Sequence, residues 1–153
     1  MSGVTKKYMS WEKFDSDVTE FIGFINQHNF TENSVILALK RGGFATAAAL
    51  SNKTGIPIST VAYQTRDGND NSPNFLEPEL ITNASKIIIP DDIYDTGLTI
   101  ENTIGALINN FDVSIDNIVG LFHYGSNKLE NTKLKLYRVM DSNENSWCVF
   151  PWE

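Results

Sequence analysis

Three carboxylates gathered at the end of an apolar segment are the residues of this sequence best placed to do chemistry. Asp91 and Asp92 lie inside the run Ile87-Ile-Ile-Pro-Asp-Asp-Ile-Tyr-Asp-Thr-Gly-Leu-Thr99, and Asp95 begins a small turn near its end. Apolar residues then resume at helical spacing, at Ile100, Ile104, Leu107 and Ile108. The pattern therefore predicts a buried strand, a turn and a helix. In an open parallel sheet such a junction attracts phosphate through free backbone N–H groups and the helix dipole.

The turn itself has the composition of a phosphate site. It consists of Asp95, Thr96, Gly97, Leu98 and Thr99. Its glycine lets the backbone approach a ligand closely, and its two threonines offer hydroxyl donors. Phosphate alone would be repelled by Asp91 and Asp92, so these residues predict a phosphorylated sugar whose hydroxyls and Mg²⁺ are held by the carboxylates. The alternative is an ordinary strand–turn–helix with a solvated acidic turn.

This thirteen-residue pattern resembles the phosphoribosyl pyrophosphate (PRPP) signature of type I phosphoribosyltransferases. The resemblance implies an α/β fold, a central, mostly parallel twisted sheet flanked by helices. It also implies transfer of 5-phosphoribosyl from PRPP to a base, with Mg²⁺ as cofactor and pyrophosphate released. Asp91 and Asp92 are then implied as catalytic and metal-binding residues, and Asp95 as the candidate general base.

A second anion site is predicted at Leu39-Lys-Arg-Gly-Gly43, directly after the first apolar strand. Two glycines expose backbone amides, and an arginine fork suits bidentate contact with phosphate. The alternative is a strand end with solvated charges. Type I phosphoribosyltransferases carry a pyrophosphate loop here, which often reads Arg-Gly-Gly in the xanthine–guanine subgroup. The resemblance implies that Lys40, Arg41, Gly42 and Gly43 bind substrate, and that the Lys40–Arg41 peptide is cis.

The C-terminal segment Ser146-Trp-Cys-Val-Phe-Pro-Trp-Glu153 is unusually aromatic. Chain ends fray unless they are tied down, so the aromatic residues predict docking, and Trp147 offers a flat face for a planar base. Simple packing of Trp147, Phe150 and Trp152 is the alternative. The ending resembles that of bacterial xanthine–guanine phosphoribosyltransferases, in which the tryptophan stacks on the purine and the next residue contacts the base edge. The resemblance thereby implies that Trp147 and Cys148 bind the base.

One departure from that family concerns the base. The purine enzymes place a lysine just after the strand that here reads Val119-Gly-Leu-Phe-His-Tyr124, whereas Lys128 lies four residues beyond Tyr124. His123 and Tyr124 are the donors available for a purine 6-oxygen, although His123 is equally readable as structural. An oxo-purine such as guanine, xanthine or hypoxanthine is favoured. A non-catalytic PRPP or nucleotide sensor and a pyrimidine phosphoribosyltransferase remain alternatives.

The remaining elements predict one domain over residues 1–153. Apolar periodicity predicts helices over Trp11–Asn26, capped by Ser10, and over Phe44–Thr54, and strands over Val35–Leu39, Ile58–Tyr63, Lys86–Pro90, Asn117–His123 and Leu134–Val139. Alternation of strand and helix predicts right-handed parallel units. The N-terminal helix region and the C-terminal tail are expected to form a small hood.

Gln64 to Pro73 shows no periodicity and is rich in polar residues and glycine. Together with Asn74 to Asn83 it makes a connection of about 20 residues, a length that usually signals function. We interpret it as an active-site lid, with Arg66 as its one cation, closing over pyrophosphate. A passive exposed loop or a weak hairpin is the alternative.

The composition and charge of the chain argue against several classes of ligand and partner. The chain has 12 basic and 19 acidic residues, a formal net charge of −7, and no concentration of lysine and arginine, which argues against a nucleic-acid backbone as ligand. Cys148 is the only cysteine, which leaves no intrachain disulfide or cysteine metal cluster. No apolar run or signal segment stands out, so a cytoplasmic protein without membrane anchor is expected. Its partners would be PRPP and a purine base, and the resemblance implies a homodimer or homotetramer.

Overall fold

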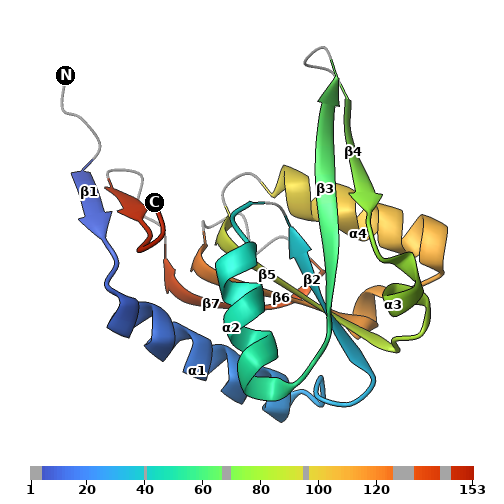
Figure 1. The fold of residues 1–153 in the computed structure, drawn as a ribbon, viewed down its shortest axis with the longest axis horizontal. Coiled ribbons are helices and arrows are strands. Elements are labelled where there is room, and N and C mark those ends of the chain that lie inside the picture. The colour runs from blue at the N-terminus through green and yellow to red at the C-terminus, as the bar shows by residue number, and fades with distance from the viewer. Residues whose placement is uncertain (1–4, 40, 67–69, 95–96, 126–132, 142–145) are drawn as a thin grey trace.

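A computed structural model of the chain describes residues 5–39, 41–66, 70–94, 97–125, 133–141 and 146–153, with backbone alone for residues 64–66, 70, 71 and 141. Figure 1 shows a six-stranded sheet with helices on both faces, and a separate two-stranded sheet made by the two chain ends. None of the described helices is long and apolar enough to cross a bilayer.

Strands and helices alternate as far as β3, and again from α3 to β6, as the sequence predicts. In order they are β1 (Thr5–Tyr8), α1 (Trp11–Gln27), β2 (Ser34–Leu39), α2 (Phe44–Thr54), β3 (Ile58–Arg66), β4 (Asp70–Phe75), α3 (Pro78–Thr82), β5 (Lys86–Tyr94), α4 (Leu98–Phe111), the 3₁₀ turn η1 (Ile115–Asn117), β6 (Ile118–Gly125), β7 (Lys135–Asp141) and β8 (Ser146–Val149). The large sheet has the order β4-β3-β2-β5-β6-β7, and only β3 and β4 are antiparallel. This confirms the predicted mostly parallel α/β fold.

Both faces of the sheet are buried because its inner strands carry continuous apolar runs. In β2, Ile36 and Ala38 face a cluster formed with α1 and α2, while Val35, Leu37 and Leu39 face one formed with α3 and α4. Strand side chains alternate between faces, so a continuous apolar run supplies two cores at once. All six residues of β2 are buried.

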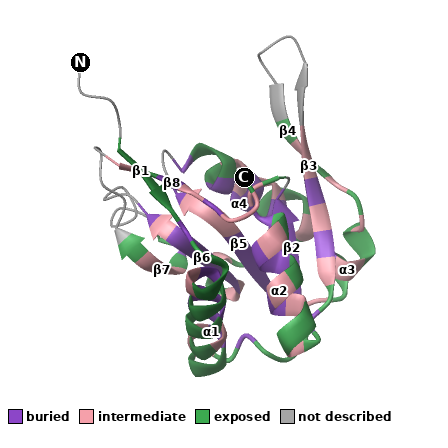
Figure 2. Ribbon diagram, turned by 60° about the vertical axis from the view of Figure 1, so that its left-hand side comes forward, coloured by how far each residue is buried: buried purple, intermediate pink, exposed green. Residues whose placement is uncertain are grey.

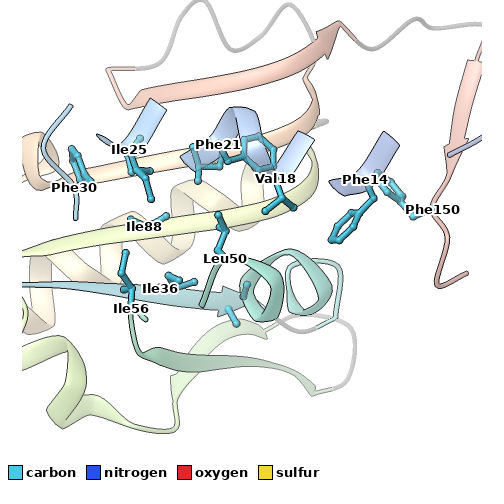
Figure 3. Packing of buried hydrophobic residues seen from close by; sticks show 14 of the residues in the cluster. Phe14, Val18, Phe21, Ile25, Phe30, Ile36, Leu50, Ile56, Ile88 and Phe150 are labelled. Carbon is cyan, nitrogen blue, oxygen red and sulfur yellow. The ribbon is translucent and has the colours of Figure 1, made fainter. Parts of the chain in front are cut away.

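Helix α1 lies across one face through a single apolar stripe. Ser10 caps it by accepting a hydrogen bond from the Lys13 amide at 3.0 Å, as the sequence predicts. Figure 3 shows its buried side chains pointing toward residues of α2, β2 and β5, and they include Phe14, Val18, Phe21 and Ile25. One polar residue, Asp17, lies in the same stripe and is 1% exposed.

Strand β5 is longer than the predicted Lys86–Pro90, so Pro90 lies inside it and not at its end. The register explains this tolerance. Strand β2 pairs with β5 only as far as Ile36 opposite Ile88, whereas β6 stays paired through Tyr94. Beyond Ile88 the ladder between β2 and β5 has ended, so Pro90 removes no hydrogen bond to β2. The acidic residues after it therefore lie where β5 is paired with β6 alone.

The connection after Tyr63 forms a hairpin in its described part. Strands β3 and β4 pair from Val61 opposite Phe75 to Arg66 opposite Asp70, and they project from the rest of the molecule in Figure 1. The hairpin alternative is thus correct for these residues, and α3 follows it where no helix was predicted. Residues 67–69 lie outside the described part.

The two chain ends form the predicted hood. Strand β1 pairs with β8 in parallel, from Thr5 opposite Ser146 to Tyr8 opposite Val149. All four residues of β1 are exposed, as Figure 2 shows, whereas Cys148 in β8 is buried and belongs to the core. The small sheet is tied down at its C-terminal side, where Phe150 is 2% exposed and belongs to the core under α1.

Candidate active site

The loop after β2 and the acidic end of β5 are in direct contact. A Cβ atom added to Gly42 would lie 2.7 Å from a carboxylate oxygen of Asp92, and one added to Gly43 would lie 2.6 Å from the Pro90 carbonyl oxygen. At Gly43 the obstacle is the backbone itself, so no side chain fits there, whereas a side chain at Gly42 would displace the Asp92 carboxylate. The exposed Arg41 precedes them at the same edge. The predicted pyrophosphate loop and the predicted acidic residues of β5 thus lie against each other.

Asp91 and Asp92 are held by the backbone next to them. The Asp92 amide donates to Asp91 Oδ1 at 2.8 Å, and the Ile93 amide donates to Asp92 Oδ1 at 2.7 Å. Burial, and then the neighbouring charge of Asp92, raise the pKa of the Asp91 carboxyl well above its usual range. A cation near this pair would reverse both effects.

The turn after β5 is shaped by a tyrosine that the sequence analysis did not single out. Gly97 has φ of 81°, in the left-handed region, and the Tyr94 hydroxyl occupies the space that a Cβ atom would need. Tyr94 is 3% exposed, and burial raises its pKa. The Glu101 amide donates to the Gly97 carbonyl at 2.8 Å and starts α4. Because Tyr94 directly precedes the predicted turn, its position was the available signal.

The donor set suits Mg²⁺ better than a metal that needs an all-protein cage. Among the described residues no group of three or more His, Cys, Asp or Glu side chains converges on one point. Mg²⁺ is usually bound by one or two carboxylates together with substrate phosphates and water. Asp91 and Asp92 supply two carboxylates at an open strand end, which fits that pattern.

Tyr63 also reaches this region, from β3, and was not predicted as a site residue. Its hydroxyl donates to the Thr99 carbonyl oxygen at 3.0 Å and contacts the Thr103 hydroxyl. Burial raises the pKa of Tyr63, and the charge of Asp91 raises it further. Tyr63 therefore lies between the acidic strand end and the first turn of α4.

His123 lies elsewhere than expected for a base donor. It is fully buried on the α1 and α2 side of β6, with Nδ1 2.7 Å from Asp17 Oδ2 and Nε2 2.8 Å from Thr46 Oγ1. In the neutral ring Nδ1 donates to the carboxylate and Nε2 accepts from the hydroxyl, so neither nitrogen remains for a ligand. The structural alternative for His123 describes this geometry, and we withdraw its assignment as a substrate-binding residue.

The next residue, Tyr124, lies near the tail. Its hydroxyl is hydrogen-bonded to the side chain of Cys148, and burial raises the pKa of both groups. Phe150 stacks on Trp152 with ring centroids 4.9 Å apart, whereas Trp147 is 48% exposed. Simple packing thus accounts for Phe150 and Trp152, whereas about half of the Trp147 side chain stays exposed.

Several predicted residues cannot be placed. Lys40, Asp95 and Thr96 lie outside the described residues, as does the predicted Lys40–Arg41 cis peptide. Arg66 is described by its backbone alone, in the hairpin opposite Asp70. Leu98 and Thr99 are exposed at the start of α4.

The sequence was compared with known proteins. The profile of the phosphoribosyl transferase domain family matches residues 4–153. This chain belongs to that family. Among curated proteins none matches the sequence significantly.

Solved structures of phosphoribosyltransferases share the fold at low identity. A purine phosphoribosyltransferase from Pyrococcus horikoshii is 22% identical with a TM-score of 0.71, over 97% of this chain and 94% of that one. The xanthine-guanine-hypoxanthine enzyme of Helicobacter pylori is 19% identical with a TM-score of 0.74, over the same shares. The orotate enzyme of Aeropyrum pernix is 17% identical with a TM-score of 0.64, over 86% and 73%. Purine and pyrimidine enzymes both have this architecture, so the fold does not select the base.

Proposed function

We propose that this phosphoribosyltransferase transfers the 5-phosphoribosyl group of PRPP to a purine base in purine salvage, with oxo-purines preferred. The observation that carries the proposal is the contact between Gly42 and Asp92, because it brings a pyrophosphate-type loop to the carboxylates suited to ribose. The two halves of a PRPP site then meet at one strand edge.

In the proposed reaction the bond between ribose C1 and the pyrophosphate oxygen breaks, and a bond from C1 to a purine nitrogen forms. Positive charge develops on the ribose as the leaving group departs. Asp91 and Asp92 hold the ribose hydroxyls and stabilise that charge, while Arg41 and the amides of Gly42 and Gly43 receive pyrophosphate. Mg²⁺ bound at the two carboxylates would neutralise the phosphates. Catalysis then consists mainly of positioning and electrostatics.

The turn of residues 95–99 is proposed to grip the 5′-phosphate, and Asp95 to accept the proton that the purine nitrogen loses. Trp147 would stack on the base, and Cys148 would contact its edge through the backbone. Tyr124 takes the place of the lysine. A hydrogen bond from a neutral donor contributes about 1 kcal/mol, against roughly 1.5–3 kcal/mol from a charged one. We therefore expect an oxo-purine preference with modest affinity for the free base.

The decisive experiment is a screen of free bases with PRPP and Mg²⁺, read as nucleoside monophosphate formed. Guanine, xanthine and hypoxanthine should be accepted ahead of adenine, uracil and orotate. Trp147→Ala should weaken every purine similarly, by about 1–3 kcal/mol, with Trp147→Phe as the control that keeps a ring. Tyr124→Phe should change the ranking among bases and leave the KM for PRPP unaltered.

Other outcomes would select the alternatives. Uracil or orotate as the best acceptor would make the chain a pyrimidine enzyme, and adenine as the best would overturn the oxo-purine preference. PRPP binding without transfer to any base would favour a sensor on the same fold. A structure from Neisseria gonorrhoeae that is 16% identical with a TM-score of 0.73 has ppGpp bound, so a regulatory nucleotide is the first ligand to test in that case.

Further parts of the proposal are independent of the base. Closure of the hairpin with Arg66 over pyrophosphate predicts that PRPP protects residues 64–74 from proteolysis. Mg²⁺ dependence should be abolished by a chelator and restored by added Mg²⁺. A cytoplasmic location, a homodimer or homotetramer and the absence of nucleic-acid binding also belong to the proposal.

A further inference from the structure

Tyr63 belongs to none of the motifs that the proposed function uses. Its hydroxyl is nevertheless hydrogen-bonded to the Thr99 carbonyl, which lies in one of them. Tyr63 Oη, Thr103 Oγ1 and the Thr99 carbonyl oxygen are mutually hydrogen-bonded, with Tyr63 3.0 Å and Thr103 2.7 Å from the carbonyl. Two hydroxyl protons are shared among three oxygens. Every arrangement of them therefore gives the Thr99 carbonyl at least one donor from a side chain.

The start of α4 depends on this contact because its own sequence does not fix it. Gly97 occupies the N-cap position and provides no capping side chain. A threonine that bonds back to the carbonyl four residues earlier, as Thr103 does, tends to bend a helix. A second hydroxyl arriving from another element restrains the carbonyl of that first turn against the sheet.

The element that carries Tyr63 is itself anchored. At the base of the hairpin the Thr60 amide donates to Glu77 Oε2 at 2.7 Å, and Ser59 Oγ donates to the Glu77 carbonyl at 3.1 Å. The Leu76 amide donates to the Thr60 carbonyl at 2.9 Å. Tyr63 lies three residues beyond Thr60, so its hydroxyl is presented from a fixed support and not from the tip of the hairpin.

We propose that Tyr63 is a positioning residue that orients the phosphate turn through the Thr99 carbonyl. The inference rests on the proposed function, since it assumes that residues 97–99 belong to a 5′-phosphate site. Tyr63 acts on the ligand only through the first turn of α4. Losing its hydroxyl should therefore weaken binding of the sugar phosphate and leave the pyrophosphate loop at residues 41–43 unaffected.

The test compares Tyr63→Phe with the unaltered full chain in the presence of Mg²⁺, by calorimetric titration with ribose 5-phosphate and, separately, with pyrophosphate. Tyr63→Phe should bind ribose 5-phosphate roughly fivefold more weakly, the size of one lost hydrogen bond, and pyrophosphate equally well. Tyr137→Phe is the matched control, because it removes a half-buried tyrosine hydroxyl in β7 on the opposite face of the sheet and should change neither affinity.

Thr103→Val provides a second test at the same carbonyl, in case Tyr63→Phe does not fold. Thr103→Val should also weaken ribose 5-phosphate binding and leave pyrophosphate binding unchanged. In the double variant the fold-loss of ribose 5-phosphate affinity should be smaller than the product of the fold-losses in the two single variants. Equal weakening of both ligands, or no change in either, would overturn the role of Tyr63 and leave the proposed function standing. Failure of the unaltered chain to bind ribose 5-phosphate or PRPP would overturn the proposed function, and the positioning role with it.

Discussion

The protein shields two carboxylates from solvent, Asp17 fully and Asp91 in part, and it treats them in opposite ways. Asp17 in α1 is 1% exposed, accepts a hydrogen bond from His123 and forms an ion pair with Lys13. Asp91 in β5 has Asp92 as its neighbour, and among the residues that the structure describes no cation lowers its pKa. A buried charge normally needs a partner. The first carboxylate is completed by the protein, whereas we propose that the second is completed by a bound ligand.

The largest expected effect is a loss of activity, and it concerns the region of Asp91. Replacing both Asp91 and Asp92 by Asn should lower phosphoribosyl transfer by roughly a thousandfold or more, because ribose and Mg²⁺ lose their ligands. The fold should persist, since both side chains lie at an open strand end. Steady-state kinetics and circular dichroism provide the two measurements. Normal turnover in the double variant would remove these residues from the site.

The next effect concerns stability at the other carboxylate. Asp17→Ala should lower the free energy of unfolding by about 3–5 kcal/mol, because it breaks a buried pair and leaves His123 without its acceptor. Urea denaturation measures the loss, and Asp17→Asn should recover part of it by keeping an acceptor for Nδ1. A loss in Asp17→Ala no larger than that of an exposed substitution would contradict the comparison.

A smaller effect is expected on the stability of Asp91→Asn, and the raised pKa of Asp91 sets its sign. The folded chain holds the Asp91 proton more tightly than the unfolded chain, so rising pH removes stability from the ordinary carboxyl value of 3.8 upward. The Asn variant cannot ionise. It should unfold at a higher temperature than the unaltered protein near neutral pH, with the two melting curves converging in acid.

Two controls test whether the change in melting temperature comes from the Asp91 carboxyl. Asp116→Asn alters an exposed carboxyl near the 3₁₀ turn and should leave the melting temperature unchanged. Added Mg²⁺ should raise the melting temperature of the unaltered protein more than that of Asp91→Asn. A variant less stable than the unaltered protein at neutral pH would show that Asp91 has an electrostatic partner within the protein.

The smallest expected effect concerns the ion pair between Lys13 and Asp17. Lys13 is 39% exposed and lies one helical turn from Asp17, so its ion pair is screened by water. Lys13→Met should cost about 0.5 kcal/mol or less, well below the loss at Asp17. Denaturation at low and high salt provides the readout. A loss comparable to that of Asp17→Ala would transfer the stabilising role from His123 to Lys13.

Features encoded in consecutive residues were predictable. The run from Ile87 to Thr99 predicted a strand with acidic residues at its end, then a turn and a helix. Ser10 predicted the start of α1. The end of β5 was misjudged because Pro90 usually stops a strand, and its tolerance depends on where β2 ceases to pair. That register is a property of two strands and cannot be read from either alone.

Contacts between distant residues were not predictable in the same way. Asp17 and His123 are 106 residues apart, and nothing in either neighbourhood marks them as partners. Helical spacing placed Asp17 on the buried stripe of α1, which was a usable signal of an unusual polar residue. Tyr63 had no such signal, since its contact with Thr99 depends on how the hairpin crosses the start of α4.

The pairing of β1 with β8 has a consequence for how the molecule comes into being. Thr5 aligns with Ser146, and the Met9 amide donates to the Val149 carbonyl at 2.9 Å, so nearly the whole chain separates the partners. During synthesis β1 leaves the ribosome long before β8 and waits for this partner until the elements between them have been made. Long-range pairing of this kind closes a very large loop and forms late. The central sheet can be complete while Trp147 is still unplaced, so we expect the proposed base contact to be the last part of the site to assemble.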